Sequence, residues 1–353
     1  MSLINKQFTI ADIAKGAGVS KTTVSRYLNG KFEFMSEETK KRIEMIIQVA
    51  NYQPNNVART LKSNRSMQVG VVIADIESPF SSSVIKGVGD VLSDADYSMI
   101  IINSDNSLEK EQQAISSLLS QRVDGLVVNT VSATNPFLIN LVNQGMPIVL
   151  ADRFVKNYNF DIVYVETHDA ICNVIDHLKE SGYGRLYLFT QFYANVSSRY
   201  LRREAFIEKM EMLGEIYAEQ YVFEVDISEP STVDWGIQQM LEVCQYDGAP
   251  PAIITTNGIV LLHIVNAIKK MGLQLPSDLG LCGFDDWGWA PSMGWASMIA
   301  PGITALSAHA HIVGTMSANI LLERMNGGES PKKIISVPAE LIVRGSTTLH
   351  PKD

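Results

Sequence analysis

The sequence predicts a small all-α head followed by a larger α/β body made of two doubly wound, parallel-sheet lobes. Two patterns lead to this prediction. Two short amphipathic segments separated by a glycine occur near the start, whereas from Gln68 onward short apolar runs alternate with longer amphipathic stretches. The length agrees with it, because 353 residues exceed one compact core of average size and indicate at least two domains.

The first predicted helix begins after Thr9, a suitable N-cap, and Gly18 supplies the turn that ends it. Ser20 can cap a second helix, which extends to Leu28 and ends at Asn29-Gly30. The apolar residues of the first helix recur at helical spacing, as Ile10, Ile13, Ala14 and Ala17. Two short helices joined by a glycine turn match the helix-turn-helix pattern.

The second helix has a polar face that suits nucleic acid. Val24 and Leu28 point inward, and the outward positions hold hydrogen-bonding or cationic side chains, namely Lys21, Thr22, Ser25 and Arg26. Such groups can contact base edges and phosphates. A third helix is expected from Ser36, with an apolar face that includes Ile43. The alternative is an ordinary three-helix bundle that binds no DNA.

The charge is distributed unevenly along the chain. The whole chain has a formal charge of −9, but residues 1–65 carry +6 and the remainder carries −15. A basic head on an acidic body is typical of a DNA-binding module joined to a regulatory domain. A solvated basic arm is the alternative interpretation of the charge.

The segment after Pro54 contains one or two turns of expected helix, which is too short to be stable alone in water. It could fold on DNA, with Leu61 as an apolar wedge in the minor groove. A plain linker is the alternative.

The head resembles that of the LacI/GalR family of repressors. The resemblance is carried by Thr9-Ile10-Ala11-Asp12-Ile13-Ala14, Ala17-Gly18-Val19-Ser20, Thr23-Val24-Ser25-Arg26, Leu28-Asn29, Asn51-Tyr52-Gln53-Pro54-Asn55 and Ala58-Arg59-Thr60-Leu61. It implies a homodimer on a pseudo-palindromic operator, with Ala58 and Leu61 of paired hinge helices opening the operator at its centre. The predicted DNA-binding residues are Thr9, Ser20, Lys21, Thr22, Ser25, Arg26, Asn29, Asn55, Ala58, Arg59 and Leu61.

The body contains two sets of expected buried strands. The first set is Val69-Gly70-Val71-Val72-Ile73-Ala74, Met99-Ile100-Ile101-Ile102, Gly125-Leu126-Val127-Val128 and Ile148-Val149-Leu150. The second begins near Val163 and includes Leu186-Tyr187-Leu188-Phe189, Ala252-Ile253-Ile254 and Leu279-Gly280-Leu281. Helical stretches between them predict parallel sheets covered on both faces, and two sets predict two lobes with a cleft between them.

Ligands of such sheets bind beyond the carboxyl ends of the strands. The residues there are Phe80-Ser81, Asp105, Asp152-Arg153, Asn257 and Asp285-Asp286, and Arg199, Arg202 and Arg203 open a helix after the Leu186 strand. Carboxylates, amides, arginines and aromatic rings together are typical of sites for polyhydroxylated ligands. Each residue taken alone is more often a surface or capping group, and the prediction rests on their shared position at the strand ends.

The resemblance continues over the body, from about Val69 to Arg344, and implies a periplasmic-binding-protein fold with three chain crossings between the lobes. These are expected near Thr167, near residues 295–301 and near residues 328–332. Arg202 matches the family's effector-binding arginine, and Asn257, Asp285, Phe80, Ser81 and Asp152 match other effector positions. The sequence departs from the family at Asp286-Trp287-Gly288-Trp289 and at Ser307-Ala308-His309-Ala310-His311.

The number of arginines near the cleft favours an anionic ligand. Arg153, Arg199, Arg202 and Arg203 exceed what a neutral sugar needs, although some could pair with Glu204 or Glu208. The body is most similar to regulators that respond to ketodeoxygluconate and related sugar acids. The predicted effector-binding residues are therefore Phe80, Ser81, Asp152, Arg153, Arg199, Arg202, Asn257 and Asp285.

The predicted domains are a helix-turn-helix domain at 1–53, a hinge helix and linker at 54–67, and an effector-binding and dimerisation domain at 68–353. Within the last, lobe 1 is expected at about 68–166 plus 296–328 and lobe 2 at about 167–295 plus 329–353. The function expected is a transcriptional repressor controlled by a small carbohydrate, and the alternative is a solute-binding receptor for sugar uptake.

Other functions find little support in the sequence. No apolar run approaches the ~20 residues that span a bilayer, and residues 1–9 lack the apolar region of a secretory signal. Cys172, Cys244 and Cys282 fit a reducing cytoplasm. Gly87-Val88-Gly89 lacks the third glycine of a nucleotide fingerprint, and His309-Ala310-His311 puts its histidines on different faces of a helix. We therefore expect no catalytic residue, no metal and no cofactor.

Overall fold

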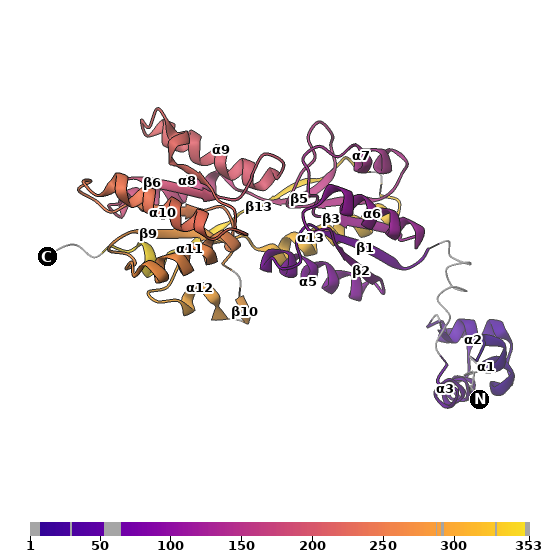
Figure 1. The fold of residues 1–353 in the computed structure, drawn as a ribbon. Coiled ribbons are helices and arrows are strands. Elements are labelled where there is room, and N and C mark those ends of the chain that lie inside the picture. The colour runs from indigo at the N-terminus through magenta and orange to yellow at the C-terminus, as the bar shows by residue number, and fades with distance from the viewer. Residues whose placement is uncertain are drawn as a thin grey trace, which may run out of the picture. The chain divides into compact units, whose positions relative to one another are not determined.

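A computed structural model (Figure 1) describes residues 8–28, 30–52, 65–286, 288–290, 293–328 and 330–349. The chain divides into two compact units, Met1–Ser66 and Met67–Asp353, and each is described by itself. None of the described helices is long and apolar enough to cross a membrane.

In its described residues, the first unit contains the α-helices α1 (Ile10–Ala17), α2 (Lys21–Leu28) and α3 (Glu37–Val49), with a 3-10 turn at Phe32–Phe34. Ile13, Val24 and Ile43, one from each helix, are fully buried in a common core. Thr9 caps α1 in a capping box with Asp12, as its position in the sequence predicts. The φ of Gly18 is +66°, a conformation that glycine adopts without a steric penalty and that ends α1 in a tight turn.

The first lobe of the second unit is a six-stranded parallel sheet with strand order β13-β5-β4-β3-β1-β2. The strands are β1 (Gln68–Ile73), β2 (Ser98–Asn103), β3 (Gly125–Val128), β4 (Ile148–Ala151), β5 (Asp161–Val165) and β13 (Ile334–Val337). Helices α5 (Pro79–Asp94) and α13 (Ala310–Met325) pack on one face, and α6 (Leu108–Ser120) and α7 (Pro136–Asn143) pack on the other. Covered faces explain the unbroken apolar runs of the inner strands.

The second lobe is built on another six-stranded sheet, with strand order β14-β12-β9-β8-β6-β7. Its strands are β6 (Leu186–Thr190), β7 (Val222–Glu224), β8 (Ala252–Thr255), β9 (Gly280–Phe284), β12 (Thr304–Ser307) and β14 (Glu340–Ile342), of which only β14 runs antiparallel. Helix α8 (His168–Glu180) packs on α9 (Ser197–Met212), and α10 (Ser231–Cys244) packs on α11 (Gly258–Met271). A short hairpin, β10 (Gly288–Ala290) with β11 (Met293–Gly294), and helix α12 (Trp295–Met298) follow β9.

Two of the three expected crossings between the lobes lie elsewhere in the structure. The first follows β5, near Thr167, but the second joins β12 to α13 and the third joins β13 to β14. Residues 296–307 therefore belong to lobe 2, not to lobe 1, because Ala296 and Ala305 are buried in its core and β12 pairs with β9. Residues 330–337 belong to lobe 1, not to lobe 2, because β13 pairs with β5.

Candidate functional site

The helix-turn-helix presents its polar residues to solvent. Val24 is fully buried, and the other side of α2 exposes Lys21, Thr22 and Arg26, with Ser25 partly buried. The guanidinium carbon of Arg26 lies 5.4 Å from the centroid of the Phe34 ring. This arrangement exposes the side chains of Lys21, Thr22 and Arg26 to a polyanion in solution.

Thr9 and Ser20 lie at the N-termini of α1 and α2. Ser20 Oγ accepts a hydrogen bond of 3.1 Å from the backbone N–H of Thr23, and both capping residues are exposed. Exposed helix N-termini suit phosphate groups. The predicted DNA contacts at Asn29, Asn55, Ala58, Arg59 and Leu61 lie outside the described residues.

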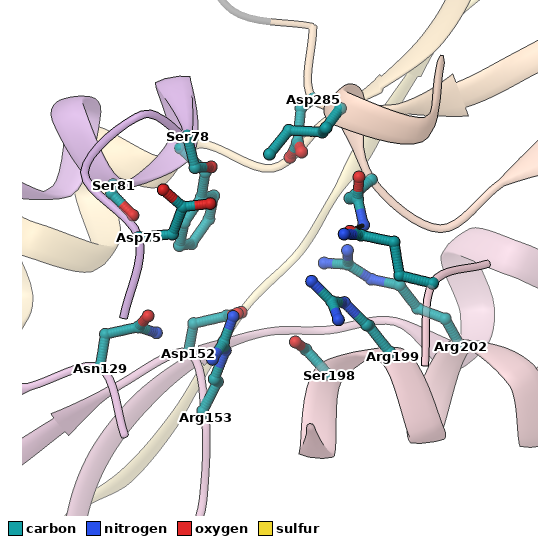
Figure 2. A pocket seen from close by; sticks show the side chains of 14 residues that line it. Asp75, Ser78, Ser81, Asn129, Asp152, Arg153, Ser198, Arg199, Arg202 and Asp285 are labelled. Atoms are coloured by element: carbon teal, nitrogen blue, oxygen red, sulfur yellow. Dashed lines mark hydrogen bonds between the residues drawn. The ribbon is translucent and has the colours of Figure 1, made fainter. Parts of the chain in front are cut away.

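The second unit contains a cavity between its two lobes (Figure 2). All eight predicted effector-binding residues line it, and they come from both lobes. The cavity encloses about 550 Å³ of space that no atom fills, part of which is open to solvent. Its described lining residues are Asp75, Ser78, Phe80, Ser81, Asn129, Asp152, Arg153, Gln191, Ser198, Arg199, Arg202, Asn257, Ile259 and Asp285.

The parallel sheets bring these residues together. Asn129, Asp152 and Gln191 directly follow β3, β4 and β6, and Asp285 directly follows β9. The carboxyl ends of the strands in both lobes therefore face one cavity. Asp152 and Asp285 have φ values of +65° and +72°, a left-handed conformation that aspartate tolerates better than most residues. This backbone turns each strand away from the sheet at the cavity.

Three arginines enter the cavity and are bonded only to backbone carbonyl or amide oxygens. Arg153 donates to the carbonyl of Thr130 at 3.3 Å and reaches Asn106 Oδ1 at 3.5 Å, and Arg199 donates to the carbonyl of Phe192 at 3.0 Å. Arg202 donates to the carbonyl of Thr256 at 2.5 Å, and its guanidinium carbon lies 3.8 Å from the centroid of the Phe284 ring. Within the described part of the chain, none of the three forms an ion pair, and Arg202 Nε is buried without a hydrogen-bond partner.

The positive charges of these arginines destabilise one another. Burial, together with the charges of Arg153 and Arg202, lowers the pKa of Arg199 to about 10. Burial also lowers the pKa of Arg153, with Asp152 acting in the opposite direction. A bound anion would relieve this repulsion and replace the water that the arginines lose on burial.

Carboxylates and amides occupy the other parts of the lining. Figure 2 shows Asp75 and Asp285 facing the arginine side chains across the cavity. Asp285 accepts a 2.8 Å hydrogen bond from the backbone N–H of Gly258, and burial raises its pKa. Asn257 caps α11 through a 2.9 Å bond from the backbone N–H of Val260 and donates to Gln191 Oε1 at 2.9 Å. The cavity thus offers cationic donors on one side and hydroxyl-binding acceptors on the other.

Three residues singled out in the sequence do not line the cavity. Arg203 is paired with Glu204 at 2.6 Å and with Glu219, and its guanidinium carbon lies 4.7 Å from the centroid of the Tyr193 ring. Asp286 is paired with Arg344 at 2.6 Å, and Asp105 with Lys110 at 2.5 Å. Their charges are satisfied within the protein.

Comparison with known proteins identifies the family. Residues 9–55 match bacterial regulatory proteins of the lacI family, and residues 175–347 match the periplasmic binding protein-like domain. The transcriptional regulator KdgR of Bacillus subtilis is 31% identical over 338 residues, 96% of this chain and 97% of the relative. The transcriptional regulator PtxS of Pseudomonas putida is 34% identical over 344 residues, 97% of this chain and 96% of the relative. The chain belongs to the LacI family.

Membership of the LacI family makes the protein a DNA-binding transcriptional regulator and not an enzyme. Solved structures confirm the predicted fold class. The lac repressor dimer bound to operator and an anti-inducer matches with a TM-score of 0.79 and 22% identity, covering 98% of this chain and all of that one. The complex of the transcriptional regulator CelR with cellobiose matches with a TM-score of 0.68 and 21% identity, covering 96% and 99%.

Six lining residues of this LacI-family regulator were not predicted from the sequence. Asp75, Asn129 and Gln191 follow recognisable strands, so the rule that located Asp152 would also have located them. Ser78, Ser198 and Ile259 lie at or next to the first turns of α5, α9 and α11, and no sequence pattern distinguishes them from ordinary helix starts.

Proposed function

We propose that this LacI-family regulator is a cytoplasmic repressor that binds a pseudo-palindromic operator as a homodimer and is released by a sugar acid of the 2-keto-3-deoxygluconate type. The observation that carries the ligand class is a set of three arginines, Arg202 buried and Arg153 and Arg199 partly buried, which form no ion pair among the described residues and face carboxylates across one cavity. The carboxylate of the ligand would bind the arginines, and its hydroxyls would donate to Asp75, Asp152 and Asp285.

The proposed DNA contacts are divided between positions that read bases and positions that bind phosphates. Lys21, Thr22, Ser25 and Arg26 of α2 would lie in the major groove, and Thr9 and Ser20 would bind phosphates at helix N-termini. Asn29, Asn55, Ala58, Arg59 and Leu61 complete the proposed interface.

The test is fluorescence anisotropy on a labelled palindromic duplex taken from upstream of the protein's own gene, with a scrambled duplex as control. We expect selective binding that 2-keto-3-deoxygluconate releases and a neutral hexose does not. Selective binding that neither compound changes would reject the ligand class and keep the repressor. Equal, weak and salt-sensitive binding to both duplexes, and to a second candidate operator, would reject the repressor itself.

The arginine cluster is tested by Arg199→Met. Removing one partner of a buried charge pair costs about 2 kcal/mol or more, so affinity for the acid should fall by about thirtyfold or more. Arg185→Met is the matched control, because Arg185 pairs with Asp247 at 2.9 Å and does not line the cavity. Calorimetric titration measures the affinity of each variant for the acid. An unchanged affinity in Arg199→Met would remove Arg199 from the site.

A further inference from the structure

A second hollow lies on the lobe 1 sheet, beside β5 and β13. On the sheet face that α6 and α7 cover elsewhere, Ile162, Tyr164 and Ile334 line this hollow together with the connection from β4 to β5 and Leu201 of α9. Ile334 is 59% exposed. The exposure therefore increases from the buried Ile162 on β5 to Ile334 on the edge strand β13. The groove contains about 1720 Å³ of space that no atom fills, part of which is open to solvent.

The groove combines an apolar, aromatic surface with a cationic rim. Phe154, Tyr158, Phe160 and Tyr164 line it, and the rings of Tyr158 and Phe160 lie 4.9 Å apart. Among the residues that the structure describes, its charged lining residues are Lys156 and Lys332, with no carboxylate. Lys332 pairs with the buried Asp161 at 3.1 Å, whereas Lys156 has no ion pair among the described residues and lies 5.0 Å from the centroid of the Tyr200 ring.

We propose that this groove binds a small amphipathic anion, a flat aromatic ring that carries a carboxylate or sulfonate. The ring would pack against the aromatic lining, and the anionic group would lie at the free charge of Lys156. The groove has room for one such molecule, because small-ligand sites measure roughly 300–1,000 Å³. The positive charge of Lys156, which forms no ion pair among the described residues, favours an anion over a neutral or basic aromatic compound.

The groove is separate from the effector cavity but shares its framework. No residue lines both. The connection that begins with Asp152 and Arg153 in the cavity continues into the groove, and α9 gives Leu201 to the groove and Arg202 to the cavity. The backbone N–H of Phe154 donates to Ser197 Oγ at 3.0 Å, which joins the two segments. A ligand in the groove therefore touches both lobes.

The probe for this site is 8-anilinonaphthalene-1-sulfonate, titrated onto the full-length protein and followed by its fluorescence. We expect saturable binding of one probe per chain. Lys156→Glu should weaken it at least fivefold, whereas Lys269→Glu, an exposed lysine on α11 away from the groove, should leave it unchanged. Equal affinity in all three proteins, or no saturable binding to the wild type, overturns the proposal.

A pair of variants at one exposed position tests the charge directly. Ile334→Glu and Ile334→Lys have similar size and polarity, so both should fold, which circular dichroism checks. We expect loss of probe binding in Ile334→Glu and retention in Ile334→Lys. Equal loss in both variants rejects an anionic ligand. A change of oligomeric state in either variant, seen by sedimentation, assigns the groove to a second copy of the chain and overturns the small-molecule site.

Discussion

At the residue scale, Glu111 supports the loop beside the effector cavity, although its position in the sequence does not indicate this role. Its carboxylate is completely buried and accepts hydrogen bonds from the backbone N–H of Val131 at 2.7 Å, Asn135 Nδ2 at 2.6 Å and Thr130 Oγ1 at 3.1 Å. Burial raises its pKa, and these hydrogen bonds act in the opposite direction. Because the carbonyl of Thr130 accepts from Arg153, Glu111 holds the loop that positions a cavity arginine.

We predict that Glu111→Ala lowers both stability and affinity for the proposed acid. The substitution leaves buried donors without an acceptor, which costs about 1–3 kcal/mol for each lost partner, and it frees the loop beneath Arg153. Chemical denaturation and calorimetric titration measure the two effects. Glu109→Ala on the same helix is the control, because Glu109 is exposed and should change neither quantity. Normal affinity in a destabilised Glu111→Ala would show a purely structural role.

The contrast between Glu111 and Asp285 explains which site residues the sequence could predict. Asp285 ends a recognisable apolar run, and the ends of parallel strands meet at one edge whatever the details of packing. Glu111 lies on a helix among other charged residues, and its burial depends on where the loop at 130–135 folds back. That contact is set by tertiary structure, which local patterns do not encode.

At the element scale, the packing of α5 on α13 depends on two glycines. A Cβ atom on Gly87 would lie 2.1 Å from the carbonyl oxygen of His311, and one on Gly314 would lie 2.1 Å from that of Val84. Both obstacles are backbone atoms, so the helices would have to separate. No nucleotide-binding role was expected for Gly87, because the motif lacks its third glycine. The close approach of the two helices explains why a glycine occupies this position.

We predict that Gly87→Ala destabilises the protein by about 3 kcal/mol, the upper range for overpacking of a core. Gly89→Ala is the matched control two residues away. Its Cβ would lie 3.3 Å from the flexible Cε of Met99, and alanine favours a helix more than glycine does. Urea denaturation should show a large decrease in the free energy of unfolding for Gly87→Ala and little change for Gly89→Ala. Similar stabilities would contradict the close packing.

At the same scale, a buried carboxylate, Asp161, binds the segment that connects α13 to β13. Asp161 at the start of β5 is buried and accepts from Arg324 at 2.7 and 3.0 Å and from the backbone N–H of Lys333 at 2.8 Å. Burial raises the pKa of Asp161, but these partners together lower it below its usual value. Its stabilising effect is therefore present above the unfolded pKa of about 4 and is lost as pH falls through the lower folded value.

We predict that Asp161→Asn costs about 3 kcal/mol at pH 7, because Arg324 loses its buried partner. The difference in unfolding free energy between wild type and variant should narrow as the pH falls below about 4. Urea denaturation at several pH values measures it. A difference that stays constant down to pH 3 would show that the charge of Asp161 contributes nothing.

The same region shows why the lobe boundaries were not predictable. The sequence located the inner strands, such as β3 and β4, because they are continuous apolar runs buried on both faces. Strand β13 is an edge strand with alternating exposure, and β14 has only three residues. Without these two strands the third crossing was placed too early in the chain, and without β12, which has only four residues, the second was as well.

At the scale of the whole molecule, the two units differ in charge as their proposed roles require. The head carries +6 and the rest of the chain −15. Phosphate contacts by the head release counterions, so operator affinity should fall steeply with salt. The acidic body does not attract the DNA phosphates. We therefore assign DNA binding to the first unit and ligand binding to the cavity of the second unit.

If the ligand controls DNA binding, the coupling between the two sites must be reciprocal. A ligand that lowers operator affinity by a given factor has its own affinity lowered by the same factor when operator is bound. We predict that calorimetric titration of 2-keto-3-deoxygluconate into the protein–operator complex gives a weaker affinity than titration into free protein. Anisotropy with and without the acid should give the same ratio. The scrambled duplex should leave the ligand's affinity unchanged. Equal ligand affinities with and without operator would mean that the cavity binds the acid without controlling the head, and repression would then need a different signal.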